Sequence, residues 1–564
     1  MGIYLNPGNE GFQSALNSQI YVDKTGMLEY TNSVLDSEQR YICVSRPRRF
    51  GKSITAEMLV AYYDKSCDSS MLFRNLKISG AEDYTAHRNK YDVIHIDVNS
   101  FRGRANSASE MVVLMQREII AELEESYPKA FPEKMEQLAF ALSQVHKIYK
   151  VQFVVIIDEW DAVFRESKDD TEAQKEYIAF LCSLFKDAPT KKFIKLAYLT
   201  GILPIKKYGT ESALNNFDEF TMLEADVLAE YVGFTEEEVH NLYAQYNMDF
   251  EQAQQWYDGY VLGLGTHIYN PKSVVDSIRR KRIGNYWVST ETYESLKSYI
   301  SMNFDGLKDD ITQMLAGGTC KVNPAKFQND MTSFKSKDDI LTLLIHLGYL
   351  TYEETSQTVS IPNEEVRSEF VNAIEDAGWE YVVKAIRASD ELLEETLRGD
   401  EQAVAKGIEA VHLSNTSILN YNDENSLSCV ITLAYYKAVN DYVLIRELPT
   451  GKGYADIAFI PKRNSDKPAM IVELKWDKSA DGAIEQIERN HYTETLKEYK
   501  GNILLVGINY DKKQRDMYAE LRRHNNRSFR AGAHPSVPAL FRNHTFPHAA
   551  SKLKETFGAS VCTQ

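Results

Sequence analysis

The chain has 564 residues, with 64 Lys or Arg and 81 Asp or Glu, and its formal net charge is −17 at pH 7. This length allows three or four domains, and the negative charge argues against a protein that coats nucleic acid without specificity. No run of eighteen or more apolar residues occurs, the N-terminus lacks the basic start and apolar core of a signal peptide, and the six cysteines form no Cys-x-x-Cys pair. We therefore expect no membrane span, no zinc site, no disulfide and a cytoplasmic location.

A phosphate-binding loop is the first expected element. Residues 46–53, Arg-Pro-Arg-Arg-Phe-Gly-Lys-Ser, follow an apolar run at 41–44 and precede a segment with helical apolar spacing. Such a loop requires a strand before it and a helix after it, because backbone N–H groups at the helix N-terminus hold phosphate oxygens. The generic pattern begins with Gly where this chain has Arg46, and an ordinary loop that enters a helix is the alternative. The nucleotide-binding residues expected from the loop are Arg49, Phe50, Gly51, Lys52, which would reach the β- and γ-phosphates, and Ser53, whose hydroxyl would ligate Mg²⁺.

The acidic partner of a nucleotide site is expected at the end of a buried strand. Residues 154–157 are a continuous apolar run, as in central parallel strands, and Asp158 and Glu159 follow it directly. Asp158 would hold Mg²⁺, usually through water, and Glu159 would polarise the attacking water as a general base. The alternative is a buried strand that ends in two solvated carboxylates.

Two more strands are expected in the same sheet. Residues 93–98 alternate as in a buried edge strand, and residues 193–199 form an apolar strand followed by Thr200. A polar residue at that strand end commonly senses the γ-phosphate in P-loop ATPases, so Thr200 is the candidate, with a plain strand-end turn as the alternative. Strands that alternate with helices predict a three-layer α/β domain with a mostly parallel sheet.

The middle of the chain predicts a small helical module. Residues 338–347 form an amphipathic helix that ends at a Gly cap, Gly348. Residues 349–352 and 358–361 would then pair as a hairpin, and another helix opens at residue 362. Helix, hairpin and helix suggest a winged-helix-like module, which either binds DNA or serves as a lid on a P-loop ATPase. The wing is acidic, so we favour the lid or packing role.

A second chemical signature lies near the C-terminus. Residues 453–460 and 469–475 predict two adjacent antiparallel strands, which would bring Asp456 and Glu473 together. Glu473 and Lys475 are two residues apart, so their side chains leave the same face of the strand. Two carboxylates and a lysine on one patch can bind Mg²⁺, activate water and stabilise a pentavalent phosphate. Charged strand faces are frequent, so the tripeptide alone is weak support.

At these motifs the chain resembles bacterial AAA-ATPase-like proteins that carry a C-terminal PD-(D/E)XK nuclease-like domain. The loop of that family has the same Arg-Pro-Arg-Arg-Phe-Gly-Lys sequence, so Arg46 departs from generic P-loops and not from this family. The matching segments are residues 21–25, 46–53, 158–161, 256–260 and 269–271.

The resemblance also implies further nuclease residues. The pattern Asp…Glu-x-Lys is that of the PD-(D/E)XK fold, with Ala455 where the name has Pro. The next helix of this fold often carries a Gln near the site, which is Gln486 here. An acidic residue from the first helix often completes the metal shell, and Glu424 is the candidate. The last strand is expected at residues 502–508. Related domains can lose catalysis and keep the shape, so a domain that only binds stays an alternative.

Taken together, the sequence predicts an α/β chain with a P-loop NTPase domain, a winged-helix-like middle and a restriction-endonuclease-like domain. The expected boundaries are 1–265 for the AAA-ATPase-like domain, 266–385 for the helical and winged-helix-like region, 386–525 for the nuclease-like domain and 526–564 for a poorly ordered tail.

The expected function is ATP binding and hydrolysis coupled to an Mg²⁺-dependent nuclease domain. The resemblance implies DNA as the nucleic acid, in mobile elements or defence. Two basic clusters are candidate DNA tracks, with a solvated surface as the alternative for each: Arg46, Arg48, Arg49, Lys206 and Lys207, and Arg522, Arg523, Arg527 and Arg530. The expected cofactors are ATP and Mg²⁺, with nucleic acid as partner, a homo-oligomer or protein partner as a further possibility, and no membrane. One alternative is a nucleotide-regulated scaffold or signalling ATPase whose nuclease-like domain is inactive, and another is a transposon-associated helper that needs a protein partner.

Overall fold

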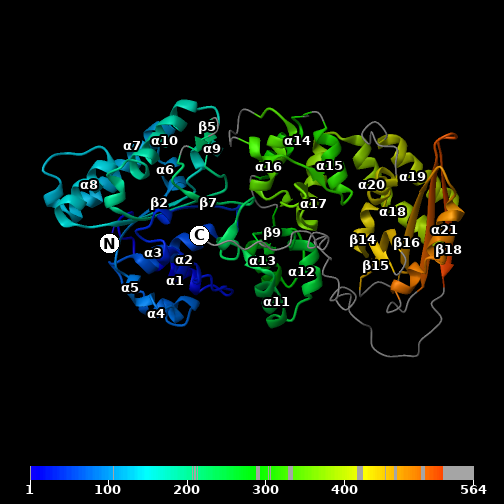
Figure 1. Cartoon of the computed structure of the whole chain (residues 1–564), viewed down its shortest axis with the longest axis horizontal. Coiled ribbons are helices and arrows are strands. Elements are labelled where there is room, and N and C mark those ends of the chain that lie inside the picture. Colours follow the sequence, from blue (N-terminus) through cyan, green and yellow to red (C-terminus); the bar gives the residue numbers. More distant parts are fainter. Residues whose placement is uncertain are drawn as a thin grey trace, which may run out of the picture. The chain divides into compact units, whose positions relative to one another are not determined.

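The structure is a computed structural model of the whole chain. It describes residues 2–524 apart from short gaps, at 106, 206, 209–210, 213, 264, 288–291, 303, 305, 328–333, 416–423, 451–452, 463–466 and 497–501. The expected tail at 526–564 lies outside the described residues. The chain divides into two compact units, Met1–Trp379 and Glu380–Gln564, each with its own sheet (Figure 1). We call them unit 1 and unit 2.

Unit 1 is built on a five-stranded sheet with the order β2-β3-β4-β1-β7, in which all neighbouring strands are parallel. The predicted parallel sheet is therefore confirmed, and the sheet has one further edge strand, β7. Its strands are β1 (Tyr41–Ser45), β2 (Asp92–Asp97), β3 (Phe153–Asp158), β4 (Ile194–Gly201) and β7 (Asp218–Phe220).

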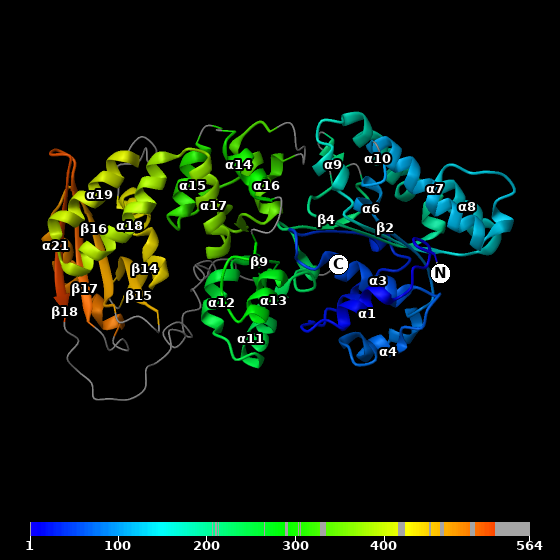
Figure 2. The same ribbon diagram turned by 180° about the vertical axis from the view of Figure 1, so that it is seen from behind.

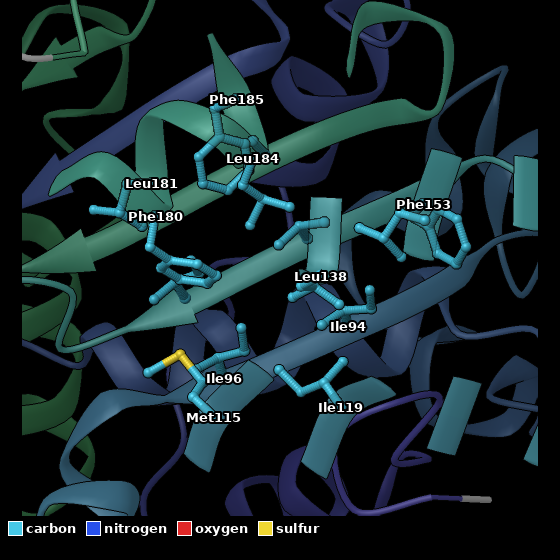
Figure 3. Packing of buried hydrophobic residues seen from close by; sticks show 14 of the residues in the cluster. Ile94, Ile96, Met115, Ile119, Leu138, Phe153, Phe180, Leu181, Leu184 and Phe185 are labelled. Carbon is cyan, nitrogen blue, oxygen red and sulfur yellow. The ribbon is translucent and has the colours of Figure 1, made fainter. Parts of the chain in front are cut away.

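Helices cover both faces of this sheet (Figures 1 and 2). On one face, apolar residues of β2 and β3 pack against α7 (Ala108–Ser126), α8 (Leu138–Tyr149) and α10 (Thr171–Phe185). Figure 3 shows this core, with Met115 and Ile119 of α7 beside Ile94 and Ile96 of β2. Helix α3 (Lys52–Tyr63) contacts β2, β3 and β4. The apolar run of β3 is buried throughout because it is covered from both sides.

Shorter elements surround this layer. They are α1 (Glu10–Leu16), α2 (Met27–Ser33), α4 (Ser70–Phe73), α5 (Tyr84–His87), α6 (Val98–Arg102), α9 (Ala162–Glu166), β5 (Lys207–Tyr208) and β6 (Glu211–Ser212).

The chain next forms a small helical layer with its own three-stranded sheet of order β8-β10-β9. Buried residues of α11, α12, α13, β8 and β10 make one apolar cluster. The elements are β8 (Phe234–Thr235), α11 (Glu236–Gln245), α12 (Phe250–Tyr257), β9 (Tyr260–Leu262), β10 (Thr266–Tyr269) and α13 (Pro271–Arg280).

The predicted helix, hairpin and helix follow. Helix α16 ends at Gly348, whose φ of +84° favours glycine, and β12 pairs antiparallel with β13. A third strand, β11, joins β13 on its other side, which completes a winged-helix-like sheet. The elements are α14 (Thr292–Ile300), α15 (Leu307–Leu315), β11 (Cys320–Lys321), α16 (Lys337–Leu347), β12 (Thr351–Glu353), β13 (Thr358–Ser360) and α17 (Glu364–Asp376).

Unit 2 has a mixed five-stranded sheet with the order β14-β15-β16-β17-β18. Only β16 and β17 pair in parallel, and the other neighbours are antiparallel. The expectation of a last strand at 502–508 is wrong, because β18 follows β17 at the sheet edge. The strands are β14 (Tyr442–Thr450), β15 (Gly453–Pro461), β16 (Ala469–Trp476), β17 (Ile503–Asp511) and β18 (Asp516–His524), and the helices are α18 (Glu380–Arg398), α19 (Glu401–Asn415), α20 (Glu424–Ala434) and α21 (Ala480–Arg489).

Candidate nucleotide and nuclease sites

The loop between β1 and α3 is shaped to accept phosphate. Gly51 has a φ of +94° and is the N-cap of α3, and no side chain caps the helix at that position. The amides of the first turn therefore have no side-chain partner at the cap, which is the arrangement that binds anions at helix N-termini. The loop forms part of the wall of a cavity of about 1270 Å³. The loop residues that line it are Arg48, Arg49, Phe50, Gly51, Lys52 and Ser53.

Lys52 of the phosphate-binding loop lies near the two carboxylates at the end of β3, Asp158 and Glu159. The Nζ of Lys52 donates to the carbonyl oxygen of Pro47 at 3.0 Å, and burial lowers the pKa of the lysine. Burial raises the pKa of Asp158, while a hydrogen bond with Ser53 and the nearby Lys52 charge act in the opposite direction. The two residues expected to hold Mg²⁺, Ser53 and Asp158, are therefore neighbours.

Glu159 lines the same cavity from the end of β3. Its backbone has a φ of +53°, an uncommon conformation for a residue with a side chain, and burial raises its pKa. Its Oε2 accepts from the Nη2 of Arg165. Sequence reasoning missed Arg165, although its position four residues after Asp161 is the spacing of an ion pair on a helix.

Thr200 lies opposite Asp158 in the β3–β4 pairing. It is fully buried, and its hydroxyl donates to the carbonyl oxygen of Val44 at 3.1 Å. It is not among the residues that line the cavity. Lys52, Ser53 and Glu159 therefore line the cavity together, whereas Asp158, beside Ser53, and its strand neighbour Thr200 are not among the lining residues.

Arg46 lies in the interior of unit 1 and not on its surface. It is completely buried, and its Nη1 donates to the carbonyl oxygens of Ser45, Phe220 and Thr221 at 2.9, 3.0 and 3.1 Å. Its place in a DNA track is therefore wrong. The second suggested track also fails at Arg522, whose guanidinium contacts three carboxylates at 3.1 Å each: Asp481, Glu488 and Glu520. Arg527 and Arg530 lie outside the described residues.

The rest of the cavity lining combines apolar and polar residues from several parts of the chain. They include residues before α2, residues of α3, α6 and α9, and residues near α13. Two cationic side chains of α13, Lys272 and Arg279, also line the cavity. The apolar lining residues include Phe12, Ile20, Tyr21, Val22, Phe234 and Val275.

In unit 2 the antiparallel pairing of β15 with β16 sets Ile457 against Val472, which puts Asp456 next to Glu473. The Oδ2 of Asp456 accepts from the backbone N–H of Leu474 at 2.7 Å. The Nζ of Lys475 donates to the Oε1 of Glu473 at 2.9 Å, and the Nε2 of Gln486 donates to the same oxygen. Asp456, Glu473, Lys475 and Gln486 therefore form one cluster around Glu473.

Glu473 is the residue of this cluster whose surroundings point most directly to a metal ion. Its side chain is 2% exposed, and its Oε2 is buried without a hydrogen-bond partner among the described residues. Burial and the neighbouring Asp456 charge raise its pKa to about 7. A buried carboxylate oxygen without a partner is unfavourable, and a divalent cation shared with Asp456 would satisfy it. The residues present therefore fit a metal ion.

The third expected metal ligand is less defined. Glu424 begins α20, a helix that contacts β16, but its side chain lies outside the described part of the structure. Within that described part, no three His, Cys, Asp or Glu side chains form a group that could hold a metal. Sequence reasoning missed Tyr492, whose hydroxyl accepts from the Nε2 of Gln486 at 3.2 Å. Its position six residues after Gln486 was the available signal.

Comparison with known proteins identifies a family for each of two regions of the chain. Residues 10–210 match the family model described as "Predicted AAA-ATPase", and residues 422–520 match the PD-(D/E)XK nuclease superfamily. The chain carries an ATPase domain of AAA type and a domain of the PD-(D/E)XK nuclease superfamily. The resemblance expected from the motifs is thereby confirmed, and with it the fold class of both domains.

Several solved structures are similar over long stretches at low identity. Cdc6p from Pyrobaculum aerophilum is 10% identical with a TM-score of 0.23, covering 65% of this chain and 98% of its own. The Aeropyrum pernix ORC2 protein, solved as ADPNP–ADP complexes, is 12% identical with a TM-score of 0.30 and the same coverage. The replication initiator DnaA, bound to AMPPCP and single-stranded DNA, is 11% identical with a TM-score of 0.24, covering 67% and 94%. Similarity this weak carries no residue correspondence.

No curated protein matches the chain by sequence. Among the described residues, no helix has both the length and the apolar character needed to cross a membrane.

Proposed function

We propose that unit 1 binds and hydrolyses ATP with Mg²⁺, and that unit 2 is an Mg²⁺-dependent nuclease domain that acts on DNA. The observation that carries the first part is that Lys52, Ser53 and Glu159 line one cavity large enough for a nucleotide, with Asp158 beside Ser53 and Lys52. The observation that carries the second part is the buried, unpartnered Oε2 of Glu473 beside Asp456.

The cavity favours one orientation of ATP. The phosphates belong at the N-terminus of α3, because the loop amides and Lys52 are there. The base belongs at the apolar end, where Tyr21 and Phe234 offer aromatic surface. Lys272 and Arg279 of α13 add positive charge to the wall. Bound Mg²⁺ would neutralise phosphate charge, with Ser53 and Asp158 as its protein ligands.

In unit 2, Asp456 and Glu473 would hold the cation, and Glu424 is the proposed third ligand. Bound Mg²⁺ would lower the pKa of a water molecule and polarise the scissile phosphate. The Lys475 ammonium, placed by its 2.9 Å contact with Glu473, would stabilise negative charge that develops on the phosphate. Gln486 would orient Glu473 from α21. DNA is the proposed substrate because the domain belongs to a nuclease superfamily.

The ATPase proposal is tested with two variants and a matched control. Lys52→Ala should abolish tight ATP binding, and Glu159→Gln should bind ATP yet hydrolyse it about 10²-fold more slowly, the scale of a general base. The control is Lys65→Ala, which removes a lysine that pairs with Asp92 away from the cavity lining. Tight ATP binding by Lys52→Ala would show that the loop is not a phosphate site. Hydrolysis at the parent rate by Glu159→Gln would remove Glu159 as the base.

The nuclease proposal needs cleavage assays on single- and double-stranded DNA and RNA, with and without ATP and Mg²⁺. Asp456→Ala and Glu473→Ala should each abolish metal-dependent cleavage, whereas Lys475→Ala should keep metal binding and lose cleavage. The matched control is Glu485→Ala, an exposed carboxylate next to Gln486. ATP hydrolysis should persist in all four variants. Undiminished cleavage by Lys475→Ala would contradict the catalytic interpretation, and RNA cleavage without DNA cleavage would contradict the substrate.

A further inference from the structure

One arginine in unit 1 binds three carboxylates at the nucleotide cavity. The Nε of Arg165 contacts the Oδ2 of Asp161 at 2.9 Å, its Nη2 contacts the Oε2 of Glu159, and its Nη1 lies 3.5 Å from the Oε1 of Glu166. The Arg165 side chain is only 7% exposed, and it lines the cavity together with Glu159 and Glu166. Glu166 also pairs with Arg102 at 3.1 Å and with Arg48 at 3.8 Å, whereas the Glu159 carboxylate has its ion pair with Arg165.

The contact with Asp161 fixes one edge of the guanidinium. Asp161 is completely buried, and its Oδ2 also accepts from the backbone N–H groups of Ile202 and Leu203 at 3.1 and 2.9 Å. These bonds tie Asp161 to the segment after β4, so the Nε edge of Arg165 has little freedom. The Nη groups point away from this anchor toward the two glutamates of the cavity wall.

The contact with Glu159 has a chemical consequence. A general base must present a carboxylate oxygen to water, but the Oε2 of Glu159 accepts from the Nη2 of Arg165. A terminal phosphate is a strong competitor for a guanidinium, because it offers several charged oxygens to the same donors. ADP lacks the γ-phosphate, which is the terminal phosphate of ATP, and would leave the pair intact.

We propose that Arg165 holds Glu159 in the nucleotide-free chain and exchanges this partner for the terminal phosphate of ATP. The exchange frees Glu159 to activate water only when ATP is present. It requires a rotation of the Glu159 side chain while Arg165 stays anchored on Asp161. This inference rests on the proposed ATPase function and adds a residue that distinguishes ATP from ADP.

A purely structural role for Arg165 makes a different prediction. An arginine that only fastens α9 to Asp161 would weaken ADP and ATP binding equally when it is replaced. An arginine that meets the terminal phosphate affects ATP selectively. The ratio of the two affinities therefore separates the two roles, whatever happens to overall stability.

The experiment measures binding of Mg²⁺-AMP-PNP and Mg²⁺-ADP to the full chain by calorimetry. Arg165→Gln should weaken AMP-PNP binding by about 10- to 100-fold, the effect of one lost charged hydrogen bond or more, and change ADP binding by less than about threefold. Arg165→Lys, which keeps the charge, should recover part of the AMP-PNP affinity. The matched control Arg104→Gln removes another ion-paired arginine of unit 1, which contacts Glu118 outside the cavity lining, and should change neither affinity.

A double-mutant cycle tests the competition directly. Glu159→Gln should raise AMP-PNP affinity several-fold, because Arg165 no longer has to leave a carboxylate, and this gain should vanish in the Arg165→Gln background. An unchanged AMP-PNP to ADP ratio in folded Arg165→Gln and Arg165→Lys would overturn the inference. A parent chain that binds neither nucleotide would instead overturn the ATPase proposal itself.

Discussion

Arg46 stands where a generic phosphate-binding loop has glycine, and its replacement tests whether the residue serves the nucleotide or the fold. Arg46→Ala removes three carbonyl contacts of Nη1 between 2.9 and 3.1 Å. Hydrogen bonds to a charged donor stabilise by about 1.5–3 kcal/mol each, or about 4–9 kcal/mol for three. Burial lowers the pKa of Arg46 to about 10, which corresponds to a desolvation cost of about 3 kcal/mol. We therefore expect Arg46→Ala to destabilise unit 1 by about 3 kcal/mol.

Urea unfolding followed by tryptophan fluorescence measures this effect, because four of the five tryptophans lie in unit 1. Arg40→Ala is the matched control, since Arg40 is also buried and donates to carbonyl oxygens at the other end of β1, among them that of Ile194 at 3.0 Å. Both variants should unfold at lower urea, and folded Arg46→Ala should bind AMP-PNP within about threefold of the parent, because Arg46 does not line the cavity. Unchanged stability of Arg46→Ala, or a loss of affinity beyond tenfold in the folded variant, would refute this reasoning.

Three further expectations concern both units. Gln486→Ala should lower cleavage about tenfold with metal affinity reduced less, because Glu473 loses a donor that orients it; metal-titrated cleavage measures both. Burial raises the pKa of Glu365 to about 7, above its ordinary value of 4.5, because the folded chain favours the protonated carboxyl. The contribution of this residue to the free energy of unfolding is therefore full below pH 4.5 and falls by about 3 kcal/mol as pH rises through 7. Glu365→Gln should flatten the pH dependence of the melting temperature between pH 5 and 8, and an unchanged slope would contradict this. Gly507→Ala should destabilise unit 2 and leave ATP hydrolysis intact, because a Cβ there would lie 2.3 Å from the Ala480 carbonyl oxygen; circular dichroism and an ATPase assay check it.

The parts of the fold that sequence reasoning predicted are those with a strong local signal. The loop at 46–53, the buried strand β3 and the hairpin of β12 and β13 each combine hydrophobic pattern with turn or cap residues. The pairing of Asp456 with Glu473 followed from strand alternation and a short connection. In each case neighbours in sequence determine the structure, so no long-range information was needed.

The missed elements depend on distant partners. Strand β7 has only three residues, and its pairing with β1 joins segments about 175 residues apart in sequence. Strand β18 carries four charged residues within nine, Asp516, Glu520, Arg522 and Arg523, which is typical of a protected edge strand and hides the apolar alternation. The ion-pair partners of Arg165 and the hydrogen-bond acceptor of the Thr200 hydroxyl also depend on the fold. Each side chain has several possible partners, and the sequence alone does not show which one it contacts.

The position of the winged-helix-like module bears on its role. The ring of Phe50 in the phosphate loop packs edge-on against Tyr260, with centroids 5.5 Å apart, and the Tyr260 hydroxyl donates to the carbonyl oxygen of Gly348 at 2.5 Å. Gly348 itself lies close to Pro47, since a Cβ at position 348 would lie 2.7 Å from the proline ring. The end of α16 therefore packs against the phosphate-binding loop, and this part of its surface is not available to DNA. Together with the exposed acidic residues Glu353 and Glu354 of the wing, these contacts favour a module that packs on the ATPase site over one that reads nucleic acid.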